Sequence, residues 1–157
     1  MSMISGGNYR QLVAASNVAA SITGTLTETN LATVTIPALR ANDQVVVVSA
    51  WSYTNSGNTK TLRIRYHTAS GTSGTVVSNG TPTTTAAQRL NIEGGNQNAT
   101  NSQSWALLTG GTAATGTTSA TTTLDTTVPT FLNFTATLAD TGETITLQSY
   151  RVEIVRV

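Results

Sequence analysis

Residues 44–67 read QVVVVSAWSYTNSGNTKTLRIRYH, and the fold class follows from this stretch. Its first half is apolar on both parities of a strand, with Val45, Val47, Trp51 and Tyr53 on one and Val46, Val48 and Ala50 on the other. Its second half alternates between Leu62, Ile64 and Tyr66 on one face and Arg63, Arg65 and His67 on the other. A period of two residues is typical of β-strands, and the turn residues 55–58 predict an antiparallel hairpin.

The same alternation recurs along the rest of the chain. It predicts two strands within residues 21–36 and further short strands near 75–78, 88–92, 103–108, 120–126, 130–138 and 144–155. Expected turns separate them at residues 37–43, 70–74, 79–82, 93–96 and 139–142, and the low-complexity residues 110–119 are expected to form an exposed loop. No pattern predicts a helix longer than about two turns.

These elements predict an all-β fold with eight to ten short strands. We expect a single antiparallel β-sandwich of jelly-roll type over residues 19–157. Residues 1–18 show neither helical nor strand periodicity and are expected to form a short N-terminal arm. In the last strand the apolar parity moves from Ile145 and Leu147 to Tyr150 and Val152, which predicts a β-bulge near residues 148–149.

The chain carries few residues that could perform chemistry. It has one His, one Lys and no Cys, and its seven carboxylates lie mostly at turns or beside glycine. His67 is expected to be a solvated or interface side chain, and a pair of carboxylates acting as acid and base is the enzyme alternative. We therefore expect a protein that is not an enzyme, with no catalytic, cofactor-binding or metal-binding residues and no cofactor.

Charge and hydropathy limit the partners. Charged residues make up 10% of the chain and the net charge is +1, whereas soluble domains average roughly 25% charged residues. The scattered basic residues predict no nucleic-acid binding. No apolar stretch approaches the roughly 20 residues of a membrane-spanning helix, and the first twenty residues lack a secretory pattern, so we expect no membrane partner and a product that stays in the cytoplasm where it is made.

Two groups of residues are candidates for a subunit interface. Residues 45–48 are apolar on both strand faces, so the second face has to be shielded from water by the chain's own arm or by a neighbouring subunit. Val46 and Val48 on that face are therefore candidate interface residues. Arg63 and Arg65 form either a plain exposed face or a contact between subunits. The aromatic residues share parity with aliphatic neighbours, so we expect them in the core rather than as platforms that stack sugars: Trp51, Trp105, Tyr53, Tyr66 and Tyr150.

Four segments carry a resemblance to a known group. SITGTLTETNLATVTIPA (21–38), SYTNSGNTKTLRIRY (52–66), NQNATNSQ (96–103) and TLADTGETITLQSYRVEIV (137–155) resemble small virion proteins of tailed phages and prophages. The resemblance implies a β-sandwich of jelly-roll type, usually trimeric, placed on the virion as a head decoration (cement) protein or as the tip of a head or tail fibre. The group has no shared catalytic motif, so no catalytic residue follows from it.

A short arm that leads directly into the sandwich favours the head over a fibre. We expect homotrimers on the capsid surface, assembled in the host cytoplasm, that bridge subunits of the major capsid protein and stabilise the mature shell. Tyr9 and Arg10 in the arm are expected to dock onto the coat. The alternative is a receptor-binding or glycan-binding fibre tip whose partner is a host-surface glycan.

Overall fold

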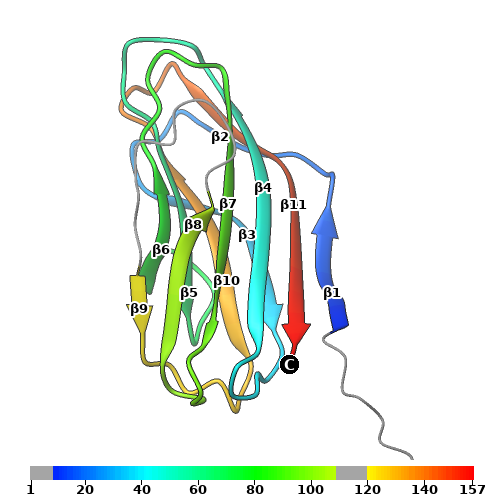
Figure 1. Ribbon diagram of the computed structural model, residues 1–157. Coiled ribbons are helices and arrows are strands. Elements are labelled where there is room, and N and C mark those ends of the chain that lie inside the picture. The colour runs from blue at the N-terminus through cyan, green and yellow to red at the C-terminus, as the bar shows by residue number, and fades with distance from the viewer. Residues whose placement is uncertain (1–8, 109–119) are drawn as a thin grey trace, which may run out of the picture.

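The computed structural model describes residues 9–108 and 120–157, which form two antiparallel sheets packed face to face (Figure 1). The strands are β1 (Tyr9–Ser16), β2 (Ala20–Thr23), β3 (Thr29–Ile36), β4 (Gln44–Tyr53), β5 (Thr61–His67), β6 (Thr75–Gly80), β7 (Ala87–Asn96), β8 (Gln103–Leu108), β9 (Ala120–Thr122), β10 (Thr130–Thr137) and β11 (Thr144–Arg156). Within these described ranges no helix is long and apolar enough to cross a membrane. The expected loop at residues 110–119 lies outside them.

The strand order is that of a jelly roll. The large sheet runs β1-β11-β4-β7-β8-β9, and the small sheet runs β3-β10-β5-β6. β1 and β2 both pair with β11, one after the other along its length, and so act together as one interrupted strand. Strands that are distant in sequence therefore lie side by side in each sheet, as in two interleaved Greek keys, and only β5-β6, β7-β8 and β8-β9 are consecutive neighbours among the described strands. The predicted antiparallel β-sandwich of jelly-roll type is confirmed.

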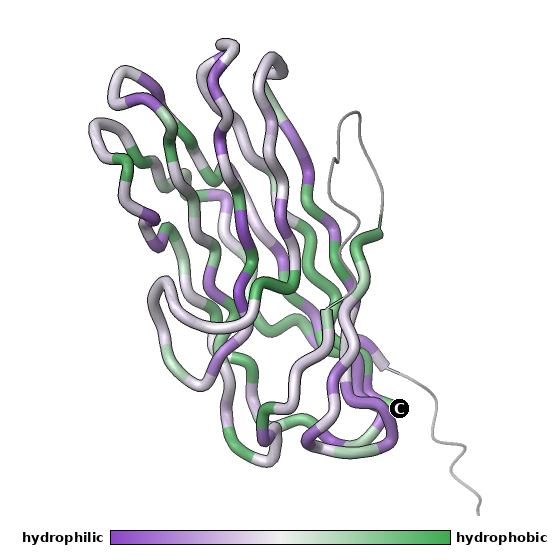
Figure 2. Tube along the Cα trace, turned by 90° about the vertical axis from the view of Figure 1, so that its left-hand side faces the viewer, coloured by the Kyte–Doolittle hydropathy of each residue, from purple (hydrophilic) through white to green (hydrophobic). Residues whose placement is uncertain are grey.

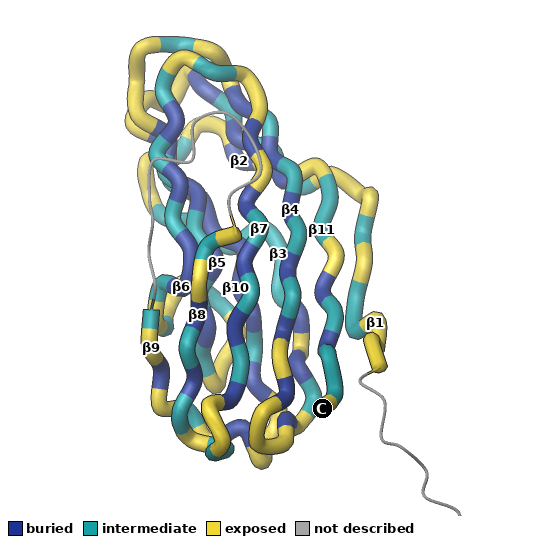
Figure 3. Tube along the Cα trace, viewed as in Figure 1, coloured by how far each residue is buried: buried dark blue, intermediate teal, exposed yellow. Residues whose placement is uncertain are grey.

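The core lies between the sheets and takes every second residue of each strand. Along β4 the buried positions alternate with half-buried ones, and Figure 3 shows the same alternation in β7 and β11. Trp105 of the large sheet packs against Tyr66 of the small sheet with ring centroids 4.8 Å apart. Hydrophobic (green) and hydrophilic (purple) positions are interspersed along the strands (Figure 2).

The predicted hairpin in residues 44–67 is wrong. β4 pairs with β11 and β7 in the large sheet, whereas β5 pairs with β10 and β6 in the small sheet. The connection, residues 54–60, is longer than the two to five residues usual in hairpins, and it crosses from one sheet to the other. The prediction of a strand holds for each half, but neighbours in sequence are not neighbours in a sheet here.

The predicted bulge in the last strand is present. The register of β11 against β4 shifts between Leu147 and Ser149, which places a bulge at Gln148.

The turn predicted at residues 93–96 is wrong, because Gly94 and Gly95 continue strand β7. A methyl group at Gly94 would clash with the Trp105 ring, and one at Gly95 would clash with the Asp43 carbonyl. These glycines permit close packing rather than a turn.

The N-terminal segment is more regular than its sequence indicates. Tyr9–Ser16 of the expected N-terminal arm over residues 1–18 forms β1 at the edge of the large sheet, and residues 1–8 of that arm lie outside the described residues. A register shift between Leu12 and Ala14 breaks the alternation of apolar residues, which explains why the sequence shows no period. β1 extends the sheet beside β11 (Figure 1), so residues 9–16 do not lie across Val46 and Val48.

A buried ion pair closes one end of the sandwich. Lys60 Nζ lies 3.0 Å from Glu143 Oε1 and donates to Ser56 Oγ at 2.6 Å and to the carbonyls of Asn58 and Thr83 at 2.9 and 3.3 Å. The hydrogen bond from Ser56 and the Lys60 charge hold the pKa of Glu143 below its ordinary value despite burial. The cluster ties together the loops 54–60, 81–86 and 138–143, which we call the tip end.

Candidate functional site

Side chains that bear chemistry are dispersed in the part of the chain that the structure describes. No group of three His, Asp or Glu side chains there could hold a metal ion. His67 Nδ1 accepts a hydrogen bond from the Ala69 amide at 3.0 Å, so the imidazole stabilises the turn after β5. The candidate sites on the described residues are surfaces.

Of the five aromatic residues expected in the core, Trp51, Trp105, Tyr53 and Tyr66 are buried there and Tyr150 packs against it partly buried. Trp51, Trp105 and Tyr66 are at most 1% exposed. Tyr150 stacks on Phe134 with ring centroids 5.0 Å apart. Burial raises the pKa of the Tyr66 hydroxyl, which accepts a hydrogen bond from Thr130 Oγ1 at 2.8 Å. Among the aromatic residues that the structure describes, only Tyr9 is largely exposed.

Arg63 and Arg65 lie on the outer face of the small sheet and are paired within the subunit. Arg65 donates to both carboxylate oxygens of Glu28 at 2.8 Å, and Arg63 lies 3.1 Å from the same carboxylate. Burial raises the pKa of Glu28, but the hydrogen bonds from Arg65 and Thr135 and the Arg63 charge outweigh it, so the pKa lies below its ordinary value. The two arginines therefore need no partner subunit to neutralise them.

Val46 and Val48 lie on the outer face of the large sheet and are half-buried. Val46 stands between Glu153 of β11 and Glu93 of β7, and Val48 stands between Arg151 and Asn91. The structure thus places the four candidate interface residues on opposite faces of the sandwich, with the valines on one and the arginines on the other. A single partner surface does not contact all four.

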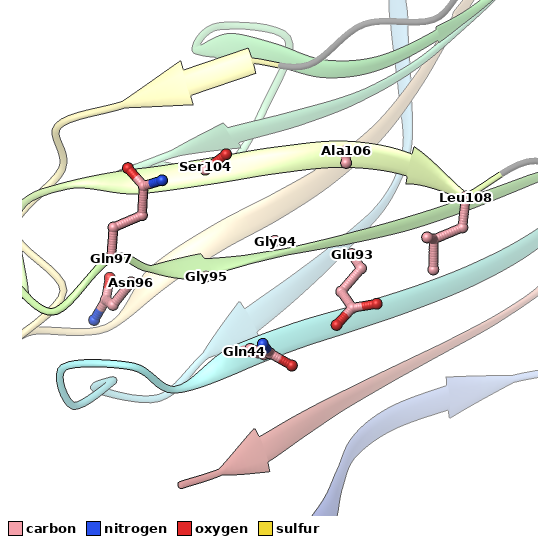
Figure 4. A pocket seen from close by; sticks show the side chains of 9 residues that line it. All are labelled: Gln44, Glu93, Gly94, Gly95, Asn96, Gln97, Ser104, Ala106 and Leu108. Atoms are coloured by element: carbon pink, nitrogen blue, oxygen red, sulfur yellow. The ribbon is translucent and has the colours of Figure 1, made fainter.

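A hollow opens on the large sheet beside Val46 (Figure 4). Its floor is the backbone of Gly94 and Gly95, and its volume is about 260 Å³. The register places Gln44 and Ser104 on either side of Gly95, while Glu93 and Ala106 form the next row. Figure 4 shows the Glu93 carboxylate at the rim on the β4 side and Leu108 on the β8 side.

A second cleft lies at the end opposite the tip end, which we call the base end. Tyr9, Arg40 and Arg156 line it together with Ala38, Leu39, Ala41, Thr100 and Thr127, and its volume is about 630 Å³. The neighbouring Arg10 has the other parity and lies 3.1 Å from Glu153. The two residues expected to dock the arm therefore face different surfaces: Tyr9 lines the base-end cleft, and Arg10 belongs to the outer face of the large sheet.

Sequence reasoning missed three residues of these surfaces. Glu28 lies in the loop before β3, 35 and 37 positions from the arginines that it binds, so no local pattern links them. Glu93 and Arg89 share the outer parity of β7. The alternation of residues 88–92 places Arg89 on the outer face, and continuing it by one residue would have added Glu93. The expected turn at 93–96 ended the predicted strand too early.

Comparison with known proteins assigns no family. No family model and no curated protein matches the chain. Among solved structures, the CBM2 module of the evolved Dit of Lactobacillus casei BL23 phage J-1 is 14% identical, with a TM-score of 0.42 over 80% of this chain and 69% of that one. The Ulex europaeus lectin I is 9% identical, with a TM-score of 0.42 over 98% and 94%.

The VP2 subviral particle of infectious bursal disease virus is 13% identical, with a TM-score of 0.31 over 96% of this chain and 37% of that one. At these values the likenesses carry no functional conclusion. The fold assignment rests on the strand order itself.

Proposed function

We propose that the protein is a structural component of a tailed-phage virion, a head decoration (cement) protein that forms homotrimers on the capsid surface and bridges subunits of the major capsid protein. The resemblance of its sequence segments to virion proteins supports this role. So does a charge-poor sandwich.

The observation that carries the docking part of this proposal is the free edge of the large sheet. β1 pairs with β11 alone, and its Tyr9 and Leu12 are 57% and 58% exposed. An edge strand offers unpaired backbone groups to another chain, and exposed apolar residues beside it add contact area. The base-end cleft at Tyr9 lies next to this edge and gives a coat subunit a shaped surface to bind.

Its action would be mechanical. Each trimer binds several coat subunits at once, and the matching arrangement of sites exists only in the mature shell. Binding then shifts the shell toward that state by mass action, without a cofactor. Assembly would take place in the host cytoplasm, and the final location would be the capsid surface.

Co-sedimentation with expanded capsids of the cognate phage tests this function. Deleting residues 1–18 would remove β1 and with it one strand of the sheet. Point variants at the edge are therefore preferable, because they change single exposed side chains and leave the strand in place. Tyr9→Ser and Leu12→Ser should each weaken capsid binding about tenfold or more. Leu26→Ser is the matched control, because Leu26 is equally exposed at 54% but lies outside the edge strand. Unchanged binding by both edge variants would contradict the proposal.

The alternative of a receptor-binding or glycan-binding tip predicts exposed aromatic residues at loop ends. Tyr9 is largely exposed, but it belongs to an edge strand, and the loops of the described residues present no comparable aromatic group. No specific observation favours this reading over the other. A glycan array probed with the purified protein distinguishes the two.

A further inference from the structure

The charged side chains of this protein are almost all paired within the subunit. Among the described residues, six ion pairs join Arg10 and Arg151 to Glu153, Arg63 and Arg65 to Glu28, Lys60 to Glu143 and Arg156 to Asp43. Two of the remaining carboxylates cap their own turns, since Asp125 and Asp140 accept hydrogen bonds from Thr127 and Gly142. Glu93 has no hydrogen bond or ion pair in the described part of the chain, and Arg40 and Arg89 have no ion pair there.

Glu93 and Arg89 lie on the same face of the same strand. Both have the outer parity of β7 and are separated by Asn91. Four residues of a strand span about 13 to 14 Å, so the two cannot pair with each other. Opposite them on β4 the register places Val46 beside Glu93, Val48 beside Asn91 and Ala50 beside Arg89. We call these six residues the β4–β7 patch.

The β4–β7 patch is electrostatically self-complementary. On β7 it carries a carboxylate at one end, a guanidinium at the other and the Asn91 amide between them, and on β4 it carries a row of small apolar side chains alongside. Turning a second copy end for end over it places Arg89 of that copy against Glu93 of the first. One such surface can close a two-fold pair, with the contact made twice, or a head-to-tail ring.

The hollow beside Glu93 has room for an arginine side chain (Figure 4). Gln44 and Ser104 supply oxygen acceptors on either side of the glycine floor, and Ala106 and Leu108 offer an apolar wall for the methylene groups. A guanidinium that reaches a carboxylate in a recess excluding water forms a strong, charge-assisted hydrogen bond.

We propose that the β4–β7 patch is the surface through which copies of this chain associate, with Glu93 of one copy binding Arg89 of the next and the Val46–Val48 pair packing between them. The contact deepens the proposed homotrimer and rests on its self-association, but it does not depend on docking to a capsid. It also gives one common role to the recess and to Glu93 and Arg89, neither of which has an ion pair within the described residues.

Sedimentation equilibrium of the purified protein tests the contact through charge reversal. Glu93→Arg and Arg89→Glu should each raise the dissociation constant of self-association about tenfold or more, because like charges then meet. The double variant Glu93→Arg/Arg89→Glu should return to within about threefold of the wild type, because the opposite charges are restored. Arg40→Glu is the matched control, since Arg40 also forms no ion pair with a described residue but lies at the base end. Thermal melts check that each variant folds.

Mixing the two single variants reads out the symmetry. A two-fold pair containing one variant of each kind has opposite charges at both contacts and should form readily. Any ring of three built from them keeps one like-charged contact and should form poorly. Recovery of association in the mixture supports the contact, and the mass of the species reports the symmetry.

The proposal is overturned by a wild-type protein that stays monomeric at a concentration of about 100 μM, by single variants that associate like the wild type, or by a double variant that is not restored. Self-association and capsid binding are measured in different experiments, so a failure of this proposal can be told apart from a failure of the proposed function. A protein that assembles through this patch but does not bind capsids refutes only the decoration role.

Discussion

Lys60 is the single lysine of the chain, and the structure buries it completely. Its ammonium group has four oxygen atoms around it, from Glu143, Ser56 and two carbonyls, so its hydrogen-bonding capacity is met. A buried ion pair of this kind holds its partners in one arrangement, because a displaced charge would lose both water and its counterion. The tip-end loops are therefore expected to be rigid.

Lys60→Met should destabilise the protein by about 3 to 5 kcal/mol, because it leaves the Glu143 carboxylate buried without a cation. The double variant Lys60→Met/Glu143→Leu should regain most of that loss, since replacing both charges by apolar groups of similar size is often close to neutral. Urea unfolding of the two variants and the wild type measures both effects. A single variant as stable as the wild type would show that the pair does not hold the loops.

Glu28 gives a stability that depends on pH. Its pKa in the folded protein lies below the ordinary value of 4.5, so the folded state binds the proton less tightly than the unfolded state. The stabilisation is fully present above about pH 4.5 and is lost as the pH falls through the lower, folded-state pKa. Glu28→Gln should therefore be less stable than the wild type at pH 7, and the difference should shrink toward pH 3.

Urea unfolding at both pH values measures this change. In an Arg63→Met/Arg65→Met background the same Glu28→Gln substitution should have a smaller effect at pH 7, because the cations that lower the pKa are gone. An equal effect in both backgrounds would assign the stabilisation to Thr135 alone, which donates to Glu28 at 2.5 Å.

At the scale of single strands, β7 shows why two adjacent glycines can lie inside a sheet. Gly94→Ala should destabilise the protein by about 1 to 3 kcal/mol, because the added methyl group overpacks the fully buried Trp105 ring. Gly57→Ala is the control, because no atom lies within 4 Å of the position that its added methyl group would take, and it should be neutral or slightly stabilising. Thermal unfolding of both variants measures the contrast, and equal melting temperatures would mean that the core relaxes around Trp105.

The elements differ in how far the sequence determines them. The bulge at Gln148 was predictable, because a slip of one residue in the apolar parity has to be absorbed where it occurs. β1 was not predictable from the sequence. A mostly exposed edge strand does not need to alternate apolar and polar residues, and the register shift at Val13 interrupts any alternation that is present. The separation of β4 from β5 depends on long-range pairing with β11 and β7, which no local window contains.

For the candidate sites, too, the sequence does not show which distant segments become neighbours. Val46 and Val48 were identified because an apolar run on both parities is visible in the sequence itself. The pairing of Arg63 and Arg65 with Glu28, and the isolation of Glu93, depend on which strands become neighbours and which loops fold over them. Sequence patterns thus indicate the faces of the sandwich, while the tertiary fold decides which charges are left for a partner.

At the scale of the whole molecule, self-association through the β4–β7 patch links stability to concentration. Because only the folded chain presents the patch, assembly stabilises the folded state by mass action. The melting temperature of the wild type should therefore rise as the protein concentration is raised, by a few degrees over a hundredfold range for a chain of this size. Differential scanning calorimetry at several concentrations measures the slope.

The variant Glu93→Arg distinguishes the stabilisation that comes from self-association from the stability of the single folded chain. Glu93 forms no ion pair within the described part of its own subunit, so the variant should melt near the wild-type temperature at the lowest concentration and show little rise above it. The double variant Glu93→Arg/Arg89→Glu should recover the slope. A wild-type melting temperature independent of concentration would leave the two half-buried valines without a second copy against them, and the outer face of the large sheet would then have to be assigned to a different partner.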